Sequence, residues 1–271
     1  PPPPAPPPRP PAPAPPARPP PPSARQGSSM FDVSADELFD AIDRLIAALL
    51  ARHGVTAPPV DAVALAQRAY RYAVREEEED DEPRRYGDRP KPKPKGRVLA
   101  FLPTHSETAR NSLAARACAK ELIAELLPKL GVAPGTENRS AQGQLVGLIA
   151  PRLVLPTRWF ATAARKASGD VVRLHDEHFP TVAYEWLCLR LLDLDEPCCI
   201  AIVDDGSVST RRGNFAQLTK KLTEAEQACV EKVQASEEAQ TVRADGWTAR
   251  GWPIPTGPFN RIILRSVPDD L

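Results

Sequence analysis

The chain has 271 residues, enough for one sizeable domain or two small ones. Its 35 lysines and arginines balance its 35 aspartates and glutamates, so net charge gives no reason to expect binding to nucleic acid or to an anionic membrane. No apolar run reaches the roughly 18 residues that a transmembrane helix needs. Five cysteines without a CxxC spacing are typical of reduced, buried thiols, and we therefore expect a cytoplasmic protein.

Residues 1–29 are a proline-rich leader, and residues 30–271 are expected to form the folded domain. Sixteen of the chain's 33 prolines fall within the first 22 residues, where alanine and arginine fill most other positions. This composition predicts a disordered segment, and it favours a spacer over a ligand for an aromatic groove. Met30 is the only methionine and directly precedes foldable sequence, so we expect translation to start there.

The first half of the domain begins with clear helix signals. Ser34–Glu37 is a capping box for a helix that ends near Gly54, and Asp61 caps a short helix that runs through Tyr70. Residues 76–96 combine an acidic run with alternating prolines and lysines, which predicts a charged loop. A short strand at 97–102 then leads to an amphipathic helix at 111–131, with an apolar stripe formed by Leu113, Ala117, Leu122, Leu126 and Leu130.

The second half predicts further helices and a hairpin. A loop is expected at 133–142, followed by helices at 144–153, 157–166, 170–178 and 181–192. Asp205-Gly206 supplies a turn between β-prone runs at 198–203 and 207–212. A charged, solvated helix is expected at 218–235, and a last strand at RIILR, residues 261–265. These helices and a few short strands indicate an α+β fold, mainly helical with a small sheet.

Several segments occur in an order that resembles the ImmA/IrrE family of zinc metallopeptidases, over most of residues 38–265. They are GVTAPPVDAVALA (54–66), the central helix, QLVGLIAPRLVLPTRWF (144–160), FPTVAYEWLCLRLLDLDEP (179–197), the hairpin IVDDGSVSTRRGN (202–214) and a terminal GW…NRIILR. The resemblance implies a metallopeptidase-like domain.

The family holds zinc with two histidines at i and i+4 of the central helix and with a glutamate from the next helix, while a glutamate at i+1 is the general base. In this chain Lys120 and Ala124 stand at the histidine positions, and Gly143 stands at the third ligand position. Only the general-base position keeps its residue, as Glu121. Because lysine, alanine and glycine offer no lone pair at neutral pH, the resemblance implies a pseudopeptidase without a metal cofactor.

Lys120 allows two interpretations. Its ammonium group could neutralise Glu121 or Glu125 near the former metal position. Alternatively, it extends into solvent, and this is the interpretation we favour.

Two functions follow. The first is a non-catalytic regulatory or protein-interaction module, for which the resemblance implies a helix-turn-helix repressor-like protein as partner. The alternative is an active metal-dependent endopeptidase with zinc in a rearranged site made by Glu121, Glu125 and His175 or His178. His175 and His178 are spaced i, i+3, but such pairs are common on solvated helices, and nothing nearby in sequence supplies a third ligand.

Overall fold

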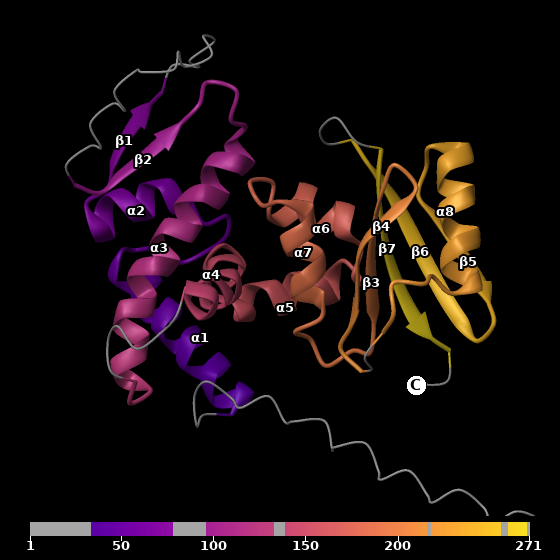
Figure 1. Cartoon of the computed structure of the whole chain (residues 1–271), viewed down its shortest axis with the longest axis horizontal. Coiled ribbons are helices and arrows are strands. Elements are labelled where there is room, and N and C mark those ends of the chain that lie inside the picture. Colours follow the sequence, from indigo (N-terminus) through magenta and orange to yellow (C-terminus); the bar gives the residue numbers. More distant parts are fainter. Residues whose placement is uncertain (1–33, 78–95, 133–138, 216–217, 256–259, 270–271) are drawn as a thin grey trace, which may run out of the picture.

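The computed structural model describes residues 34–77, 96–132, 139–215, 218–255 and 260–269 (Figure 1). Within these ranges the fold is α+β, with eight helices and seven strands. The helices are α1 (Ala35–Arg52), α2 (Ala62–Tyr70), α3 (Glu107–Lys129), α4 (Arg139–Val154), α5 (Thr157–Lys166), α6 (Val171–His178), α7 (Tyr184–Leu191) and α8 (Glu224–Ser236). The strands are β1 (Ala73–Glu76), β2 (Val98–Phe101), β3 (Cys199–Asp204), β4 (Ser207–Gly213), β5 (Gln240–Ala244), β6 (Trp247–Ile254) and β7 (Arg261–Pro268).

Five strands form one antiparallel sheet in the order β4-β3-β7-β6-β5. The predicted hairpin is confirmed: β3 pairs with β4, and Asp205 and Gly206 adopt φ values of 48° and 79° at the turn between them. Gly206 tolerates this left-handed conformation because it has no Cβ. On its other side β3 pairs with β7, the strand that contains the predicted RIILR segment.

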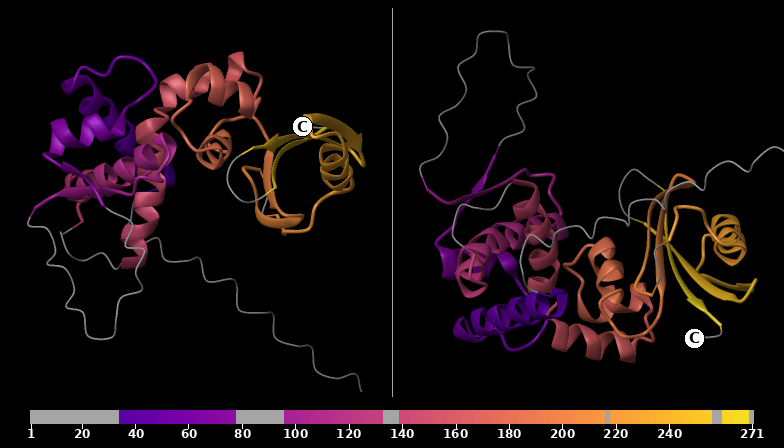
Figure 2. Two further views of the ribbon diagram at one scale, coloured as in Figure 1. Left: turned by 90° about the horizontal axis from the view of Figure 1, so that it is seen from above. Right: turned by 60° about the horizontal axis from the view of Figure 1, so that its bottom comes forward.

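The sheet lies between two helical layers (Figures 1 and 2). Side chains alternate along β3, as expected for a strand buried on both faces. Ile200 and Ile202 join the large apolar core formed with α1–α7, while Ala201 and Val203 join a smaller core beneath α8. The strand is therefore the boundary between the two cores.

Helix α3 is the central element of the N-terminal part. It contacts α1, α2 and α4, and it lies beside a second, two-stranded sheet in which β1 and β2 run parallel. Ser106 caps its first turn by accepting a hydrogen bond from Ala109 N at 3.2 Å. Of the predicted apolar stripe, Leu122 and Leu126 are buried, whereas Leu113 is 40% exposed and faces solvent. The prediction was wrong at Leu113, because the buried face of this part of α3 is formed by its neighbours Ala114, Ala115 and Cys118.

Several predicted boundaries differ from those observed. Helix α3 starts at Glu107 and not at 111, since Ser106 provides the cap. Helix α4 starts at Arg139, so residues 139–142 are helical although a loop was expected there; the rest of that predicted loop, 133–138, lies outside the described residues. Strand β1 includes Glu76, the first residue of the predicted charged loop, of which 78–95 also lie outside the described residues.

The C-terminal part contains more sheet than the sequence indicated. Strands β5 and β6 were not predicted, and β6 is eight residues long. Helix α8 starts at Glu224 and is not simply solvated, because Ala225, Glu226, Cys229, Val230 and Val233 are buried against the sheet. All five cysteines are buried and unpaired. Across the described residues, no helix combines the length and the apolar character that crossing a bilayer requires.

Candidate functional site

The carboxylate of Glu121, the residue at the general-base position, is held by two donors from outside α3. Tyr72 donates its hydroxyl proton to Oε1 at 3.0 Å, and Arg97 donates from Nη2 to Oε2 at 2.7 Å. The Glu121 side chain is 19% exposed, so the ion pair is partly shielded from water. Both carboxylate oxygens are therefore engaged.

Arg97 and Tyr72 reach Glu121 because the two-stranded sheet places them beside α3. Arg97 directly precedes β2, and its Nη1 donates to the carbonyl oxygen of Tyr70 at 3.0 Å. Tyr72 lies between α2 and β1. The guanidinium group thus links the end of α2, the start of β2 and the middle of α3 through one planar set of donors.

The phenol and the thiol nearest Glu121 both favour their neutral forms. Burial, followed by the hydrogen bond to Glu121, raises the pKa of Tyr72 from 10.0 to about 12. Burial and then the charge of Glu121 raise the pKa of Cys118 from 9.0 to about 12. The Cys118 thiol lies 3.9 Å from the carbonyl oxygen of Ala62, and a neutral thiol is neither a nucleophile nor a zinc ligand at neutral pH.

The other three residues of the degraded motif lie on the surface. Lys120 and Ala124 are exposed one turn apart on α3, and Gly143 is exposed near the start of α4, which packs against α3. A Cβ added at Gly143 would meet no atom within 4 Å. Lys120 forms no ion pair within the described residues, and the cation that neutralises Glu121 is Arg97. The interpretation favoured from the sequence, that Lys120 extends into solvent, agrees with its exposure, and the less favoured pairing with Glu121 is not seen among the described residues.

These residues do not fit a zinc ion. Lys120, Ala124 and Gly143 supply no ligand atom, and the one remaining carboxylate accepts from a guanidinium and a phenol. In the part of the chain that the structure describes, no group of three His, Cys, Asp or Glu side chains is placed to hold a metal ion.

The two histidines of the rearranged site are engaged elsewhere, on α6. His175 places Nδ1 2.7 Å from Asp176 Oδ1 and stacks on Tyr184, with ring centroids 4.1 Å apart. His178 meets Phe179 edge-on at 6.2 Å. The structure does not group either histidine with Glu121 or Glu125.

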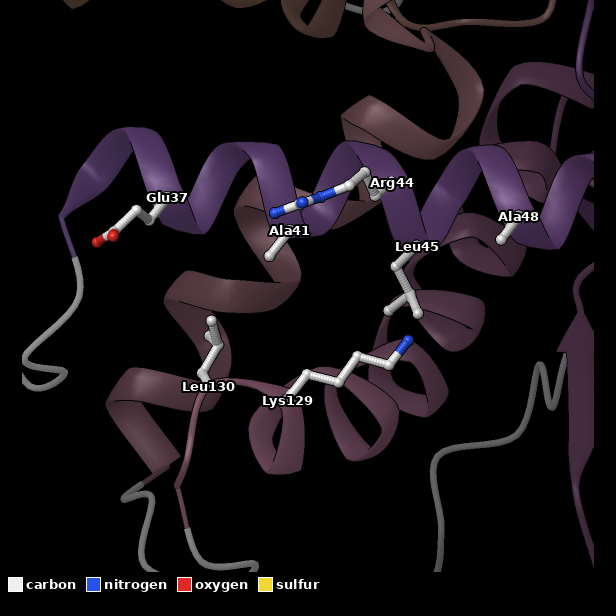
Figure 3. A pocket seen from close by; sticks show the side chains of 7 residues that line it. All are labelled: Glu37, Ala41, Arg44, Leu45, Ala48, Lys129 and Leu130. Atoms are coloured by element: carbon white, nitrogen blue, oxygen red, sulfur yellow. The ribbon is translucent and has the colours of Figure 1, made fainter.

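A groove of about 630 Å³ lies between α1 and the C-terminal end of α3 (Figure 3). Its apolar lining consists of Ala41, Leu45, Ala48 and Leu130, and Glu37, Arg44 and Lys129 lie around it. Glu37 forms the capping box with Ser34 and pairs with neither cation. Arg44 donates from Nε to the backbone oxygen of Asp40, and among the described residues neither Arg44 nor Lys129 has a carboxylate partner. The groove therefore combines an apolar floor with two available cations.

Sequence reasoning identified Glu121 but missed both of its partners. Arg97 is 24 residues before Glu121, and Tyr72 is 49 residues before it. Neither belongs to a motif; the one available signal was that Arg97 opens the predicted strand before the central helix.

Comparison with known proteins supports the fold and no more. No family model matches the chain, and no curated protein matches it. Among solved structures, a protein titled "Mycobacterium tuberculosis transcriptional regulator" is similar with a TM-score of 0.56 and 17% sequence identity, over 85% of this chain and 79% of that one. At this identity the chain shares a fold with that regulator.

Proposed function

We propose that the chain is a non-catalytic regulatory module with an ImmA/IrrE metallopeptidase-like domain, which acts by binding another protein. The observation that carries the proposal is the engagement of both Glu121 oxygens by Tyr72 and Arg97. In the family the general base acts on a water held by zinc, whereas this carboxylate is paired with a guanidinium and a phenol and has no metal-holding side chain of the motif beside it. The positions that would hold the metal carry no ligand atom.

The partner we propose is a helix-turn-helix repressor-like protein. The similarity in fold to a transcriptional regulator supports a role in transcriptional control. The groove between α1 and α3 supplies a suitable surface, because an amphipathic helix can place apolar side chains on its floor and an acidic side chain beside Arg44 or Lys129. The balanced net charge of the chain supports protein recognition over direct contact with DNA.

Metal analysis tests the absence of catalysis. We expect the purified full-length chain, after incubation with zinc and gel filtration, to retain far less than one zinc per chain and to leave an unstructured protein such as casein intact. The variant Glu121→Gln should behave identically in both assays. Stoichiometric zinc that is lost in Glu121→Gln, together with hydrolysis, would show that the chain is the metal-dependent endopeptidase of the alternative.

A two-hybrid screen against helix-turn-helix proteins tests the interaction. We expect at least one pair whose signal is lost in Ala41→Glu, which places a carboxylate over the groove, and kept in Gln67→Glu, an exposed change on α2. If every positive pair tolerates Ala41→Glu, the groove is not the recognition surface.

A further inference from the structure

The large sheet has two edge strands, β4 and β5, which differ in how well they are protected against the addition of another strand. Strand β4 pairs with β3 through a register shift between Ile202 and Val203, and such a bulge hinders further pairing. Strand β5 pairs with β6 in regular register and contains no proline or glycine. Its one charged residue, Arg243, is already paired with Asp269 at 2.8 Å. Within the described sheet, β5 is therefore the less protected edge.

The outer edge of β5 presents its backbone groups in a self-complementary pattern. The β5–β6 turn consists of residues 245–246 in the left-handed conformation, and Ala244 pairs with Trp247 across it. In such a two-residue hairpin the flanking residues exchange both backbone hydrogen bonds, and bonded and non-bonded pairs then alternate along the strands. Thr241 and Arg243 consequently belong to non-bonded pairs, so their N–H and C=O groups point away from β6.

A second copy of β5 fits this edge. When two such strands run antiparallel about a two-fold axis at Val242, Thr241 of each copy stands opposite Arg243 of the other. These residues then exchange backbone hydrogen bonds, which satisfies the outward N–H and C=O groups of both strands. No like charges face each other across the joint. The two Val242 side chains lie side by side at the axis, on the face of the sheet that packs under α8.

Helix α8 takes part in the same contact. It lies over β5 and β6, at the outer side of the molecule (Figure 1). Because neighbouring strands of a sheet are about 4.8 Å apart, pairing of the two β5 strands places the two α8 helices about 10 Å apart. Helices pack at this spacing when the side chains between them are of ordinary or small size.

The flank of α8 that faces the β5 edge suits such packing. Val230 borders the groove beside β4, which fixes the orientation of the helix, and at 100° per residue Ala228, Lys232 and Ala235 lie on the opposite flank. The two alanines allow close approach, and Lys232 forms no salt bridge among the described residues. In the antiparallel arrangement Lys232 of each copy comes within reach of Glu231 of the other. The two flanks are therefore complementary in charge as well as in shape.

We propose that the chain forms a two-fold dimer in which β5 pairs with β5 of a second copy and the two α8 helices pack beside the joint. This goes beyond the proposed function, which uses Glu121 and the α1–α3 groove. The groove lies at the other end of the molecule, so dimerisation leaves it open (Figure 1). One short strand and one helix flank are fewer than the roughly 20–30 residues that each side of a standard interface contributes. We therefore expect a weak dimer, with a dissociation constant in the micromolar range.

Sedimentation velocity of the full-length chain tests the dimer. The weight-average sedimentation coefficient should rise as the protein concentration increases over roughly 1–100 μM. Thr241→Pro removes an outward N–H and no hydrogen bond within the sheet, and it should weaken dimerisation by about tenfold or more, because each copy loses one hydrogen bond. Thr241→Ala keeps the N–H and is the matched control, so its dimerisation should match that of the unmodified chain. Far-UV circular dichroism checks that each variant is folded.

Cysteine crosslinking tests the register independently. Val242→Cys places two thiols at the axis, where the opposite Cα atoms of a non-hydrogen-bonded pair are about 4.5 Å apart, within the range of a disulfide. Oxidation with copper phenanthroline should therefore convert this variant rapidly into a covalent dimer. In Thr241→Cys the new thiols are offset by two residues along the strands, beyond the roughly 7 Å limit between Cα atoms, and should not crosslink. The five native cysteines are buried, so they do not interfere.

Three results would overturn the proposal. One is a monomer throughout this concentration range. Another is a dimer that Thr241→Pro leaves as strong as before, which would place the contact on another surface. The third is equal crosslinking of Val242→Cys and Thr241→Cys, which would contradict the two-fold register.

Discussion

The carboxylate of Glu121 connects three elements through two hydrogen bonds, one from Tyr72 and one from Arg97. Arg97 is about half exposed, so solvent screens the ion pair, and a contribution of no more than about 1 kcal/mol is expected from it. The hydrogen bond from Tyr72 is better shielded and has a measurable signature, because it keeps the phenol protonated.

Stability should fall in alkaline solution as Tyr72 and Tyr184 ionise. Burial first, and then the hydrogen bond to Glu121 for Tyr72 or the charge of Asp176 for Tyr184, raises each pKa from 10.0 to about 12. A pKa raised in the folded state means that the unfolded chain loses its protons first. The contribution of the neutral phenols is therefore complete below pH 10 and is lost as the pH rises from 10 to about 12. Urea unfolding at pH 9, 10 and 11 measures this loss together with that of the buried thiols, since burial also raises the pKa values of Cys118, Cys199 and Cys229 from 9.0.

The variant Tyr72→Phe measures how much of the loss of stability at high pH comes from Tyr72. It removes one of three phenols whose pKa is raised, those of Tyr70, Tyr72 and Tyr184, so its free energy of unfolding should depend less steeply on pH in this range than that of the unmodified chain. Absorbance of tyrosinate at 295 nm in the folded chain provides an independent titration. Equal pH dependence in both proteins would show that the hydrogen bond to Glu121 does not hold the proton.

At the scale of elements, helices with local start signals and the β3–β4 hairpin were predictable, whereas the order of the strands in the large sheet was not. Ser34 and Asp61 cap α1 and α2 as expected, because a cap depends on residues three or four apart. The order of the large sheet depends on pairs such as Cys199 with Ser266, which no local pattern specifies. The site could be predicted only in part for the same reason. Glu121 belongs to a sequence motif, whereas Arg97 and Tyr72 are brought beside it only by the tertiary fold.

Helix α8 shows how a polar residue can fix an element that looks solvated in sequence. Glu226 is fully buried and accepts from Arg211 Nε at 3.0 Å, Ser266 Oγ at 3.0 Å and Thr223 N at 2.8 Å. Arg211 lies on β4 and Ser266 on β7, so one carboxylate joins α8 to two strands. Buried acceptors with every partner in place specify a single packing arrangement.

The variant Glu226→Gln should destabilise the fold by about 3–5 kcal/mol, because it leaves the guanidinium of Arg211 buried without a counter-charge. The midpoint of urea unfolding should fall accordingly. Glu231→Gln is the matched control on the same helix. Glu231 is exposed and, among the residues that the structure describes, accepts a hydrogen bond from Gln227 alone, so the change in its free energy of unfolding should stay within about 0.5 kcal/mol. Similar losses in both variants would mean that general charge on α8, and not the buried network, stabilises it.

At the scale of the whole molecule, the large core runs without interruption from α1 to the sheet. It contains Ile42 of α1, Leu122 of α3, Leu187 of α7 and Ile263 of β7. An ion pair also joins these helices to the sheet. Asp170 caps α6 by accepting hydrogen bonds from the backbone amides of Val172 and Arg173, and it accepts a further one from Arg250 of β6 at 2.6 Å. Separating the N-terminal helices from the sheet would expose this apolar surface to water, which is costly in proportion to its area.

We therefore expect the described elements to unfold in one cooperative transition. Trp186 of α7 and Trp252 of β6 are both buried, so tryptophan fluorescence reports on the packing between helices and sheet, while circular dichroism at 222 nm follows the helices α1–α8. The two signals should give the same urea midpoint and slope, as two-state unfolding requires. If fluorescence changed at clearly lower urea than circular dichroism, the sheet with α8 would be an independent unit.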